Sequence, residues 1–324
     1  MVSILRPKAL RPGDVVAVTA LSGGLEAEEF DQYEHGLRAI EQLGFSVRVS
    51  PLIELDRHWW WSAATPQQIA EEFNTALRDP EVRGIFALTG GRTAFSYLDL
   101  IDLDAIEADP KPVMGFSDVS TVLLALHGRT GLVCVHGDLV THGLGDWHEC
   151  AQGRRTQLVD LYRRLLTDAA PVGDLPAGGQ WECWRSGRAS GRLAGGMLNR
   201  IVREQATGFA LAPERFDGAI LFWEELGVST AAIWNDLHTL RHAGVLDRIS
   251  GMVVGTPVAV DLTEGGPDSL REVVLDVLGD RDIPVLGNAD VGHNPPNVPL
   301  PLGVRAEMDA DALRLSLVES AVSV

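Results

Sequence analysis

Short apolar runs alternate with helix-forming segments through the first half of the chain. Three of these runs predict buried strands, at 14–19, 45–49 and 84–88. The segment 27–43 predicts a helix that ends at Gly44, and Thr65-Pro66-Gln67-Gln68 opens a second helix with an N-cap, a first-turn proline and a capping-box glutamine. Strands that alternate with helices predict a mostly parallel sheet, with functional groups beyond the carboxyl ends of its strands.

The second half begins with a change of composition. After a predicted helix over 154–166, residues 167–192 are rich in Gly, Pro, Ala and Asp and predict a linker that also covers part of the protein. A second series of elements follows, with strands at 219–223, 251–255, 284–286, 303–308 and 312–317, and helices through Ile201 and over 229–241 and 268–278. These elements form a second α/β unit, so we expect the domain boundary near 170–190.

Composition and charge exclude several classes of function. The 324 residues are 45% apolar, which predicts a globular protein, and their net charge of −18 argues against a nucleic-acid polymer as partner, since phosphate binding needs clustered Lys and Arg. No apolar run reaches the length of about 18 residues that a membrane span needs. The N-terminus has charges and prolines where a signal peptide needs an apolar core, and three cysteines fit reduced thiols, so we expect a cytoplasmic protein.

The segment 113–128, V-M-G-F-S-D-V-S-T-V-L-L-A-L-H-G, is the first candidate for chemistry. An apolar run turns at Gly115-Phe116-Ser117-Asp118 and continues with apolar residues at helical spacing. A serine at a sharp strand-to-helix turn holds its hydroxyl clear of the sheet, and the first helical N–H groups lie where an oxyanion would form. Ser117 and Asp118 are equally suited to plain helix capping, so this segment alone leaves both interpretations open.

Two polar residues after later strands complete a possible triad. Glu224 follows five apolar residues, where an unpaired charge is costly, although it could also complement the dipole of the next helix. His293 lies in the loop D-V-G-H-N-P-P after a predicted strand, where a histidine could also be a plain surface residue. Together with Ser117 these residues supply a nucleophile, a carboxylate and a base in the order Ser…Glu…His.

Gly90 and Gly91 occupy a loop directly after a predicted strand. The loop has neither a G-x-G-x-x-G nor a P-loop pattern, so phosphate binding is not indicated. It offers either a backbone N–H donor for an oxyanion or a plain turn.

Metal binding is the main competing chemistry. The residues with side chains suited to metals are Cys134, His136, Asp138, His142, Asp146, His148, Glu149 and Cys150. They show no C-x-x-C or H-E-x-x-H spacing, so we expect no metal and no cofactor. The run Trp59-Trp60-Trp61 is either a hydrophobic plug or an aromatic wall for a ligand or a dimer partner, and the sequence leaves both open.

Six ordered segments carry a resemblance to a known family: R-P-G-D-V-V-A-V-T-A, L-T-G-G-R-T, V-M-G-F-S-D, G-R-L-A-G-G-M-L, L-F-W-E-E and V-G-H-N-P-P. Over nearly the whole chain they resemble the LD-carboxypeptidase family of serine peptidases, which includes the microcin C self-immunity proteins. The resemblance implies an N-terminal parallel-sheet (Rossmann-like) domain over 1–168, a linker or cover loop over 169–190, and a smaller C-terminal α/β domain over 191–324. The active site is then expected at the junction of the two domains.

The resemblance also implies roles for single residues. Ser117 matches the nucleophile, Glu224 the triad carboxylate and His293 the base. Gly91 and Asp118 match the backbone donors to the oxyanion. Of the two consecutive glutamates, the family pattern makes the first one functional.

The run from Val228 to Gly255 is closer to the immunity proteins than to the murein enzymes. Trp181 matches a tryptophan that stacks on the nucleobase in immunity proteins, a contact worth about 1–3 kcal/mol. We expect Gly90, Trp181 and Val228 to contact the substrate, and the alternative role of Trp181 is that of a plug at the domain interface.

Three residues depart from the pattern of the relatives. Met197 replaces the usual Asn of a G-G-N-L motif, and Leu21 replaces a Pro before Ser22. Val228 stands where some immunity proteins have a Lys that faces an acidic side chain, which argues against an aspartyl-type substrate.

These features predict a cytoplasmic serine hydrolase that cleaves an amide or peptide bond through an acyl-enzyme. The leading expected substrate is an aminoacyl- or peptidyl-nucleotide toxin, and the family resemblance implies a homodimer. One alternative is an LD-carboxypeptidase that removes the terminal D-Ala of murein tetrapeptides. An alternative of another class is a small-molecule binding protein without catalysis.

Overall fold

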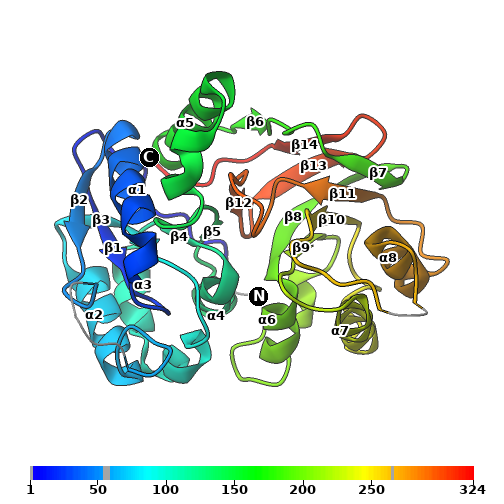
Figure 1. Cartoon of the computed structure of the whole chain (residues 1–324), viewed down its shortest axis with the longest axis horizontal. Helices are drawn as coiled ribbons and strands as arrows, with labels where there is room; N and C mark the ends of the chain where they lie inside the picture. Colours follow the sequence, from blue (N-terminus) through cyan, green and yellow to red (C-terminus); the bar gives the residue numbers. More distant parts are fainter. Residues whose placement is uncertain (1–2, 54–58, 264–265) are drawn as a thin grey trace.

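Two α/β lobes lie side by side in the computed structural model, which describes residues 3–53, 59–263 and 266–324 (Figure 1). Each lobe is built around its own sheet, and this arrangement confirms the predicted α/β class. Among the described residues, no helix combines the length and apolar character needed to cross a bilayer.

The first lobe contains a mainly parallel six-stranded sheet. Its strands are β1 (Val15–Thr19), β2 (Ser46–Val49), β3 (Val82–Ala87), β4 (Val113–Gly115), β5 (Val135–His136) and β12 (Leu300–Pro301). The helices of this part of the chain are α1 (Phe30–Gln42), α2 (Pro66–Arg78), α3 (Leu103–Ala108), α4 (Ser120–Thr130) and α5 (Gln152–Thr167). The strand order is β12-β5-β4-β3-β1-β2, and only β12 runs antiparallel to its neighbour.

The second lobe contains a mixed eight-stranded sheet. Its strands are β6 (Gly173–Asp174), β7 (Glu182–Arg185), β8 (Arg188–Met197), β9 (Ile220–Glu224), β10 (Gly251–Gly255), β11 (Val285–Ala289), β13 (Arg305–Asp309) and β14 (Arg314–Leu317). Its helices are α6 (Leu198–Glu204), α7 (Thr230–His242) and α8 (Leu270–Leu278). The order is β6-β14-β13-β8-β9-β10-β11-β7, with β8 to β11 forming the parallel centre.

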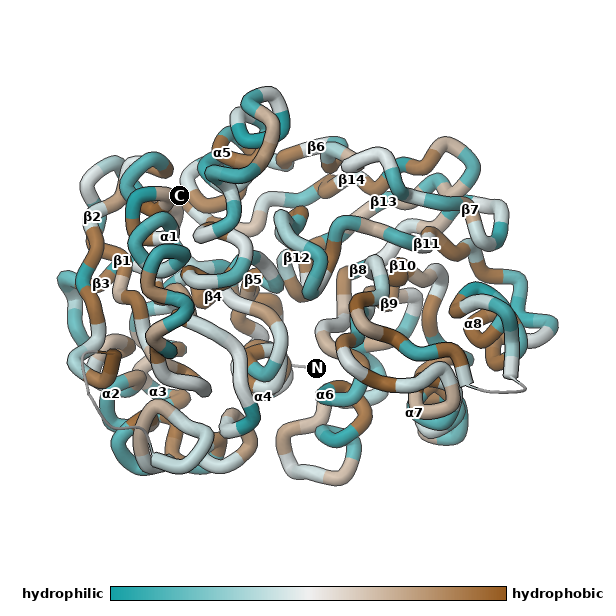
Figure 2. Tube along the Cα trace, viewed as in Figure 1, coloured by the Kyte–Doolittle hydropathy of each residue, from teal (hydrophilic) through white to brown (hydrophobic). Residues whose placement is uncertain are grey.

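Local sequence signals account for where several helices begin and end. Thr65 caps α2 in the predicted capping box: its hydroxyl accepts from the backbone N–H of Gln68 at 3.3 Å, and its own N–H donates to the Gln68 side chain at 3.1 Å. Gly131, in the left-handed region at φ 76°, ends α4. The central strands of both sheets are buried apolar runs, and β1 and β3 are strongly hydrophobic in Figure 2.

The segment 169–190, for which we predicted a linker or cover loop, supplies edge strands to the second sheet. Within it β6 pairs with β14 and β7 pairs with β11, both antiparallel. Trp181 and Trp184 are buried beside these strands. The strands are short and lie among Gly and Pro residues, which explains why the composition alone suggested a linker.

The chain returns to the first lobe after it has built most of the second. The loop after β11 reaches across to β12, which pairs with β5 and lies between the lobes in Figure 1. Near the end of the described chain, Ser323 exchanges backbone hydrogen bonds with Pro7 and Ala9. The two lobes are therefore joined by several passages of the chain.

Candidate active site

Ser117 lies directly after β4, at the carboxyl end of the first sheet. Its φ of 62° is in the left-handed region, which is unfavourable for a residue with a side chain. A short 3-10 helix over Ser117–Val119 follows and leads into α4, so the positive end of this helix lies at the serine. This is the sharp, strained strand-to-helix turn that exposes a nucleophile in other hydrolases.

His293 connects Ser117 to Glu224. Its Nε2 lies 2.9 Å from the Ser117 Oγ, and its Nδ1 lies 2.6 Å from Oε2 of Glu224. Glu224 is fully buried at the end of β9, while the histidine is partly buried. The three side chains that the sequence predicted as a triad are thus hydrogen-bonded in series, with the geometry of nucleophile, base and orienting carboxylate.

Gly292 makes this approach possible. It has a φ of 104°, and a Cβ placed on it would lie 2.5 Å from Oε2 of Glu224. A larger residue would therefore push the loop that carries His293, called the histidine loop below, away from the Glu224 carboxylate.

The loop after β3 presses its backbone against the serine. A Cβ placed on Gly90 would lie 2.7 Å from the Ser117 Oγ. One placed on Gly91 would lie 2.4 Å from the Ser22 Oγ, and Gly91 itself has a φ of 150°. Gly90 thus lies beside Ser117 and Gly91 beside Ser22, and a side chain does not fit at either position.

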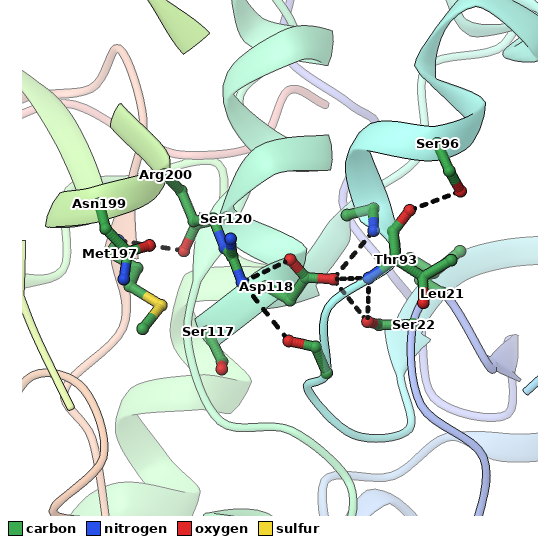
Figure 3. Close-up of polar contacts among 12 residues, drawn as sticks. Leu21, Ser22, Thr93, Ser96, Ser117, Asp118, Ser120, Met197, Asn199 and Arg200 are labelled. Atoms are coloured by element: carbon green, nitrogen blue, oxygen red, sulfur yellow. Dashed lines mark hydrogen bonds and ion pairs between the residues drawn. The ribbon is translucent and has the colours of Figure 1, made fainter. Parts of the chain in front are cut away.

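Asp118 fastens this loop with its buried carboxylate. Oδ2 accepts from the Ser22 hydroxyl at 2.6 Å and from the backbone N–H groups of Thr93 and Ala94 at 2.6 and 2.9 Å (Figure 3). Oδ1 lies 3.0 Å from Nη2 of Arg200, which comes from α6 of the second lobe. The structure therefore gives the Asp118 side chain a positioning role that the sequence did not reveal.

The second glutamate, Glu225, has a different position from Glu224. Its Oε1 accepts from the Asn199 side chain at 3.0 Å and from the Leu226 N–H at 3.1 Å, while its Oε2 accepts from the Asn199 N–H at 3.0 Å. Burial raises the pKa of Glu225 to about 7. Glu225 thus holds the first turn of α6, and it does not contact His293.

Two further aspartates hold the ends of the histidine loop. Oδ2 of Asp290 accepts from the Gly178 N–H at 2.5 Å, from Nη2 of Arg154 at 3.0 Å and from the Trp181 indole at 3.2 Å. Near the other end of the loop, the buried Asp138 accepts from the backbone and side chain of Asn297 at 3.0 and 2.8 Å. The loop that carries His293 is therefore fixed at both ends.

The other residues singled out from the sequence lie around this centre. Trp181 is only 4% exposed, so its ring is covered by protein in this structure. Val228 packs partly buried on the core in the loop between β9 and α7. The Met197 N–H donates to the Ser120 hydroxyl at 3.2 Å, and the Leu21 carbonyl accepts from the Tyr97 hydroxyl at 2.5 Å.

The three consecutive tryptophans form an exposed turn. Trp60 and Trp61 are 70% and 62% exposed, and the rings of Trp59 and Trp60 stack at 4.0 Å. The turn is closed by Ser62, whose hydroxyl donates to the Ser22 carbonyl at 3.3 Å. It is therefore attached to the network around Asp118.

The residues with potential metal-binding side chains are dispersed. His142 bonds Glu29 at 2.8 Å, His148 stacks on His35, and Asp138 holds the histidine loop. Within the described part of the chain, no three His, Cys, Asp or Glu side chains gather closely enough to hold a metal ion.

Sequence reasoning missed Arg200 and Asp290 as contributors to this site, and it did not foresee that Glu225 holds the start of α6. Arg200 and Glu225 resembled ordinary charged residues on a helix and at a helix start. The one available signal was that Asp118, if buried beside the nucleophile, would need a partner of opposite charge.

Comparisons with known proteins agree with the six segments noted in the sequence. Residues 16–137 match the LD-carboxypeptidase N-terminal domain, and residues 190–308 match the LD-carboxypeptidase C-terminal domain. The microcin C7 self-immunity protein MccF of Escherichia coli is 26% identical over 334 residues, covering 97% of this chain and 96% of MccF. A probable murein peptide carboxypeptidase of Bacillus subtilis is 27% identical over 322 residues, covering 98% of this chain and 95% of that protein.

A solved structure has the same fold. MccF in complex with aspartyl sulfamoyl adenosine matches with a TM-score of 0.88 and 25% identity, covering 98% of this chain and all of the MccF chain. The two matched domains together span more than half of the sequence. This chain therefore belongs to the LD-carboxypeptidase family.

Proposed function

We propose that this chain is a serine hydrolase that cleaves an amide or peptide bond through an acyl-enzyme. Ser117 is the nucleophile, His293 takes its proton and later delivers it to the leaving amine, and Glu224 orients the imidazole. The observation that carries the proposal is the hydrogen-bonded series from Ser117 through His293 to Glu224, built on a serine with φ 62°. No metal or cofactor takes part in this chemistry.

The backbone N–H groups of Gly91 and Asp118 are the proposed oxyanion donors. The first belongs to the loop packed against the serine, and the second to the residue that follows it at the positive end of α4. Donors fixed in this way stabilise negative charge as it develops on the substrate carbonyl oxygen.

The proposed substrate is an aminoacyl- or peptidyl-nucleotide toxin. MccF, which shares the fold over nearly the whole chain, has been captured with aspartyl sulfamoyl adenosine. Val228 contributes an apolar side chain where a cation would suit an acidic acyl group, so the acyl side chain preferred here is neutral.

Trp181 has two possible roles in this proposal. If it stacks on the nucleobase, its ring must become accessible when substrate binds. Its burial and its bond to Asp290 favour the other role, that of supporting the histidine loop. Trp181→Ala separates the two: loss of stacking raises KM for an aminoacyl-nucleotide by about 10- to 100-fold but spares a minimal substrate without a base. Loss of support lowers turnover of both substrates.

Removal of the terminal D-Ala from murein tetrapeptides is the second candidate function. It is favoured by the similarity to a probable murein peptide carboxypeptidase over nearly the whole of both chains. The same triad would attack a different carbonyl, so only substrate choice separates the two functions.

A fluorophosphonate probe tests the proposal directly. It should label the wild-type chain at Ser117 and leave Ser117→Ala unlabelled, whereas a non-catalytic binding protein would not react. Untreated enzyme, which keeps a free Ser117 hydroxyl, is then assayed on an alanyl sulfamoyl adenosine and on a murein tetrapeptide. Faster release of D-Ala from the tetrapeptide would make the murein function the leading one.

Homodimerisation and a cytoplasmic location belong to the same proposal. The family resemblance suggests the dimer, and the three cysteines, unpaired in the structure, suit a reducing compartment. Light scattering on the purified chain measures the mass of the assembly, and a monomer would remove the dimer from the proposal.

A further inference from the structure

Arg200 is a buried cation at the junction of the two lobes. It lies on α6 of the second lobe and is 6% exposed, yet its guanidinium points into the first lobe (Figure 3). Nη2 lies 3.0 Å from Oδ1 of Asp118 and 3.5 Å from the carbonyl oxygen of Gly91. One arginine therefore touches both residues whose N–H groups are the proposed oxyanion donors.

We infer that Arg200 is a positioning residue, through which the second lobe sets the geometry of the oxyanion donors in the first. This inference rests on the proposed function, because it concerns the donors Gly91 and Asp118. Arg200 acts through these two residues and is not assigned a contact with substrate.

The Asp118 carboxylate transmits the position of Arg200 to the loop after β3. Its Oδ1 faces the arginine, and its Oδ2 collects the Ser22 hydroxyl and the N–H groups of Thr93 and Ala94. A displacement of the carboxylate therefore moves the loop just after Gly91, together with the Ser22 hydroxyl. Since the pair is buried, removal of the arginine leaves the Asp118 carboxylate without its partner of opposite charge, so its position must change.

The position of Arg200 is itself fixed by neighbours on both lobes. Asn199, the preceding residue, is held by two hydrogen bonds: its backbone N–H and its side-chain amide both donate to the Glu225 carboxylate, just after β9. Met197 donates from its backbone to the Ser120 hydroxyl of α4. The first turn of α6 is thus bound to Glu225, next to the triad carboxylate, and to the helix that follows the nucleophile.

This arrangement predicts a defect in rate that is separate from binding. Oxyanion donors act only when they lie at the position of the developing charge, and a displacement of about 1 Å can lower a rate about 100-fold. Loss of Arg200 should therefore slow attack by Ser117 on any substrate, including one too small to reach other parts of the site.

The test compares Arg200→Met with Arg203→Met, an exposed arginine on the same helix. Each variant reacts with a small alkyl fluorophosphonate, and the amplitude of labelling counts folded sites while the rate constant reports their reactivity. Arg200→Met should label Ser117 about 10- to 100-fold more slowly than wild type, with a matching fall in kcat and little change in KM. Arg203→Met should behave as wild type, and Arg200→Lys should recover part of the rate.

Each alternative outcome has a distinct meaning. A lower amplitude with an unchanged rate constant would assign Arg200 to folding only and overturn the inference. An unchanged labelling rate with a raised KM for substrate would make Arg200 a substrate contact and also overturn it. If the wild-type chain itself is not labelled, the proposed function fails, and that result is separate from the behaviour of the variant.

Discussion

The proposed nucleophile and the proposed base are held in place by two different kinds of structure. Ser117 is fixed through the backbone: a strained φ, a helix start directly behind it and a fully buried carboxylate on the next residue. His293 lies in a loop whose ends are held by the side chains of Asp290 and Asp138. The comparison indicates that Ser117 itself is positioned by the backbone of its own turn, whereas His293 is positioned by side chains that hold the two ends of its loop.

The largest effect is expected at the nucleophile itself. Ser117→Ala should lower kcat by about 10⁴- to 10⁶-fold, because the reacting atom is removed while little packing is lost. The thermal unfolding curve should be close to that of wild type. A variant that keeps more than a small fraction of the activity would show that Ser117 is not the nucleophile.

The two adjacent glutamates provide the next test. Glu224→Gln should lower kcat by about 10²- to 10⁴-fold, since the side chain that orients His293 loses its charge. Glu225→Gln should cost less in kcat, because Glu225 contacts Asn199 and not the histidine. Steady-state kinetics on both variants measure this difference, and a greater loss in Glu225→Gln would mean that the functional carboxylate has been assigned to the wrong residue.

Asp118, which fastens the loop after β3, and Asp290, which holds one end of the histidine loop, test the comparison most directly. Asp118→Asn should lower kcat about 100-fold. The carboxylate that pairs with Arg200 and accepts three hydrogen bonds from the first lobe is lost, and the proposed oxyanion donors beside it are displaced. Asp290→Asn should lower kcat by about 10-fold, since Asp138 still holds the other end of the histidine loop. The measurement is kcat per fluorophosphonate-reactive site. Equal losses in the two variants would show that Ser117 and His293 depend equally on the aspartates beside them.

The smallest expected effect is on the way the free energy of unfolding changes with pH. Burial lowers the pKa of His136, in β5, from 6.5 to about 4. Below about pH 6.5 the unfolded chain binds a proton at His136 while the folded chain does not. The stability that the folded protein has above pH 6.5 is therefore lowered as pH falls toward 4.

His136→Gln removes that titration. Between pH 6.5 and 5, urea unfolding should show the wild type losing stability relative to this variant by about 1.4 kcal/mol per pH unit. Parallel curves for the two proteins would mean that the folded protein protonates His136 as readily as the unfolded chain does.

Much of the fold could be predicted because its elements are regular. Most parallel strands of the two sheets are apolar runs bounded by glycines or polar residues, and most predicted strands agree with the structure to within a few residues. Ser117, Glu224 and His293 could be proposed because each lies at the end of such a run or within a few residues after it, where parallel sheets place functional groups.

The remainder depended on long-range contacts that leave no local pattern. The two residues of β12 become a strand only because β5 lies beside them, and β7 is recognisable only through its pairing with β11. Arg200 has the same residue type as the exposed Arg203 three positions later, and only the fold distinguishes the buried one from the solvated one. The indole of Trp181 likewise donates to Asp290, more than a hundred residues further along the chain.

The repeated passage of the chain between the lobes restricts how the site can open. A hinge-like rotation of the second lobe would have to bend the connection after α5, the histidine loop that leads to β12 and the return of the chain after β14, all at once. Because the histidine loop is one of these connections, such a rotation would also draw His293 away from Ser117 or Glu224. Substrate entry and product release should therefore rely on side-chain and loop movements at the rim of a closed pair of lobes, and not on the wide domain closure common in two-lobed ligand-binding proteins.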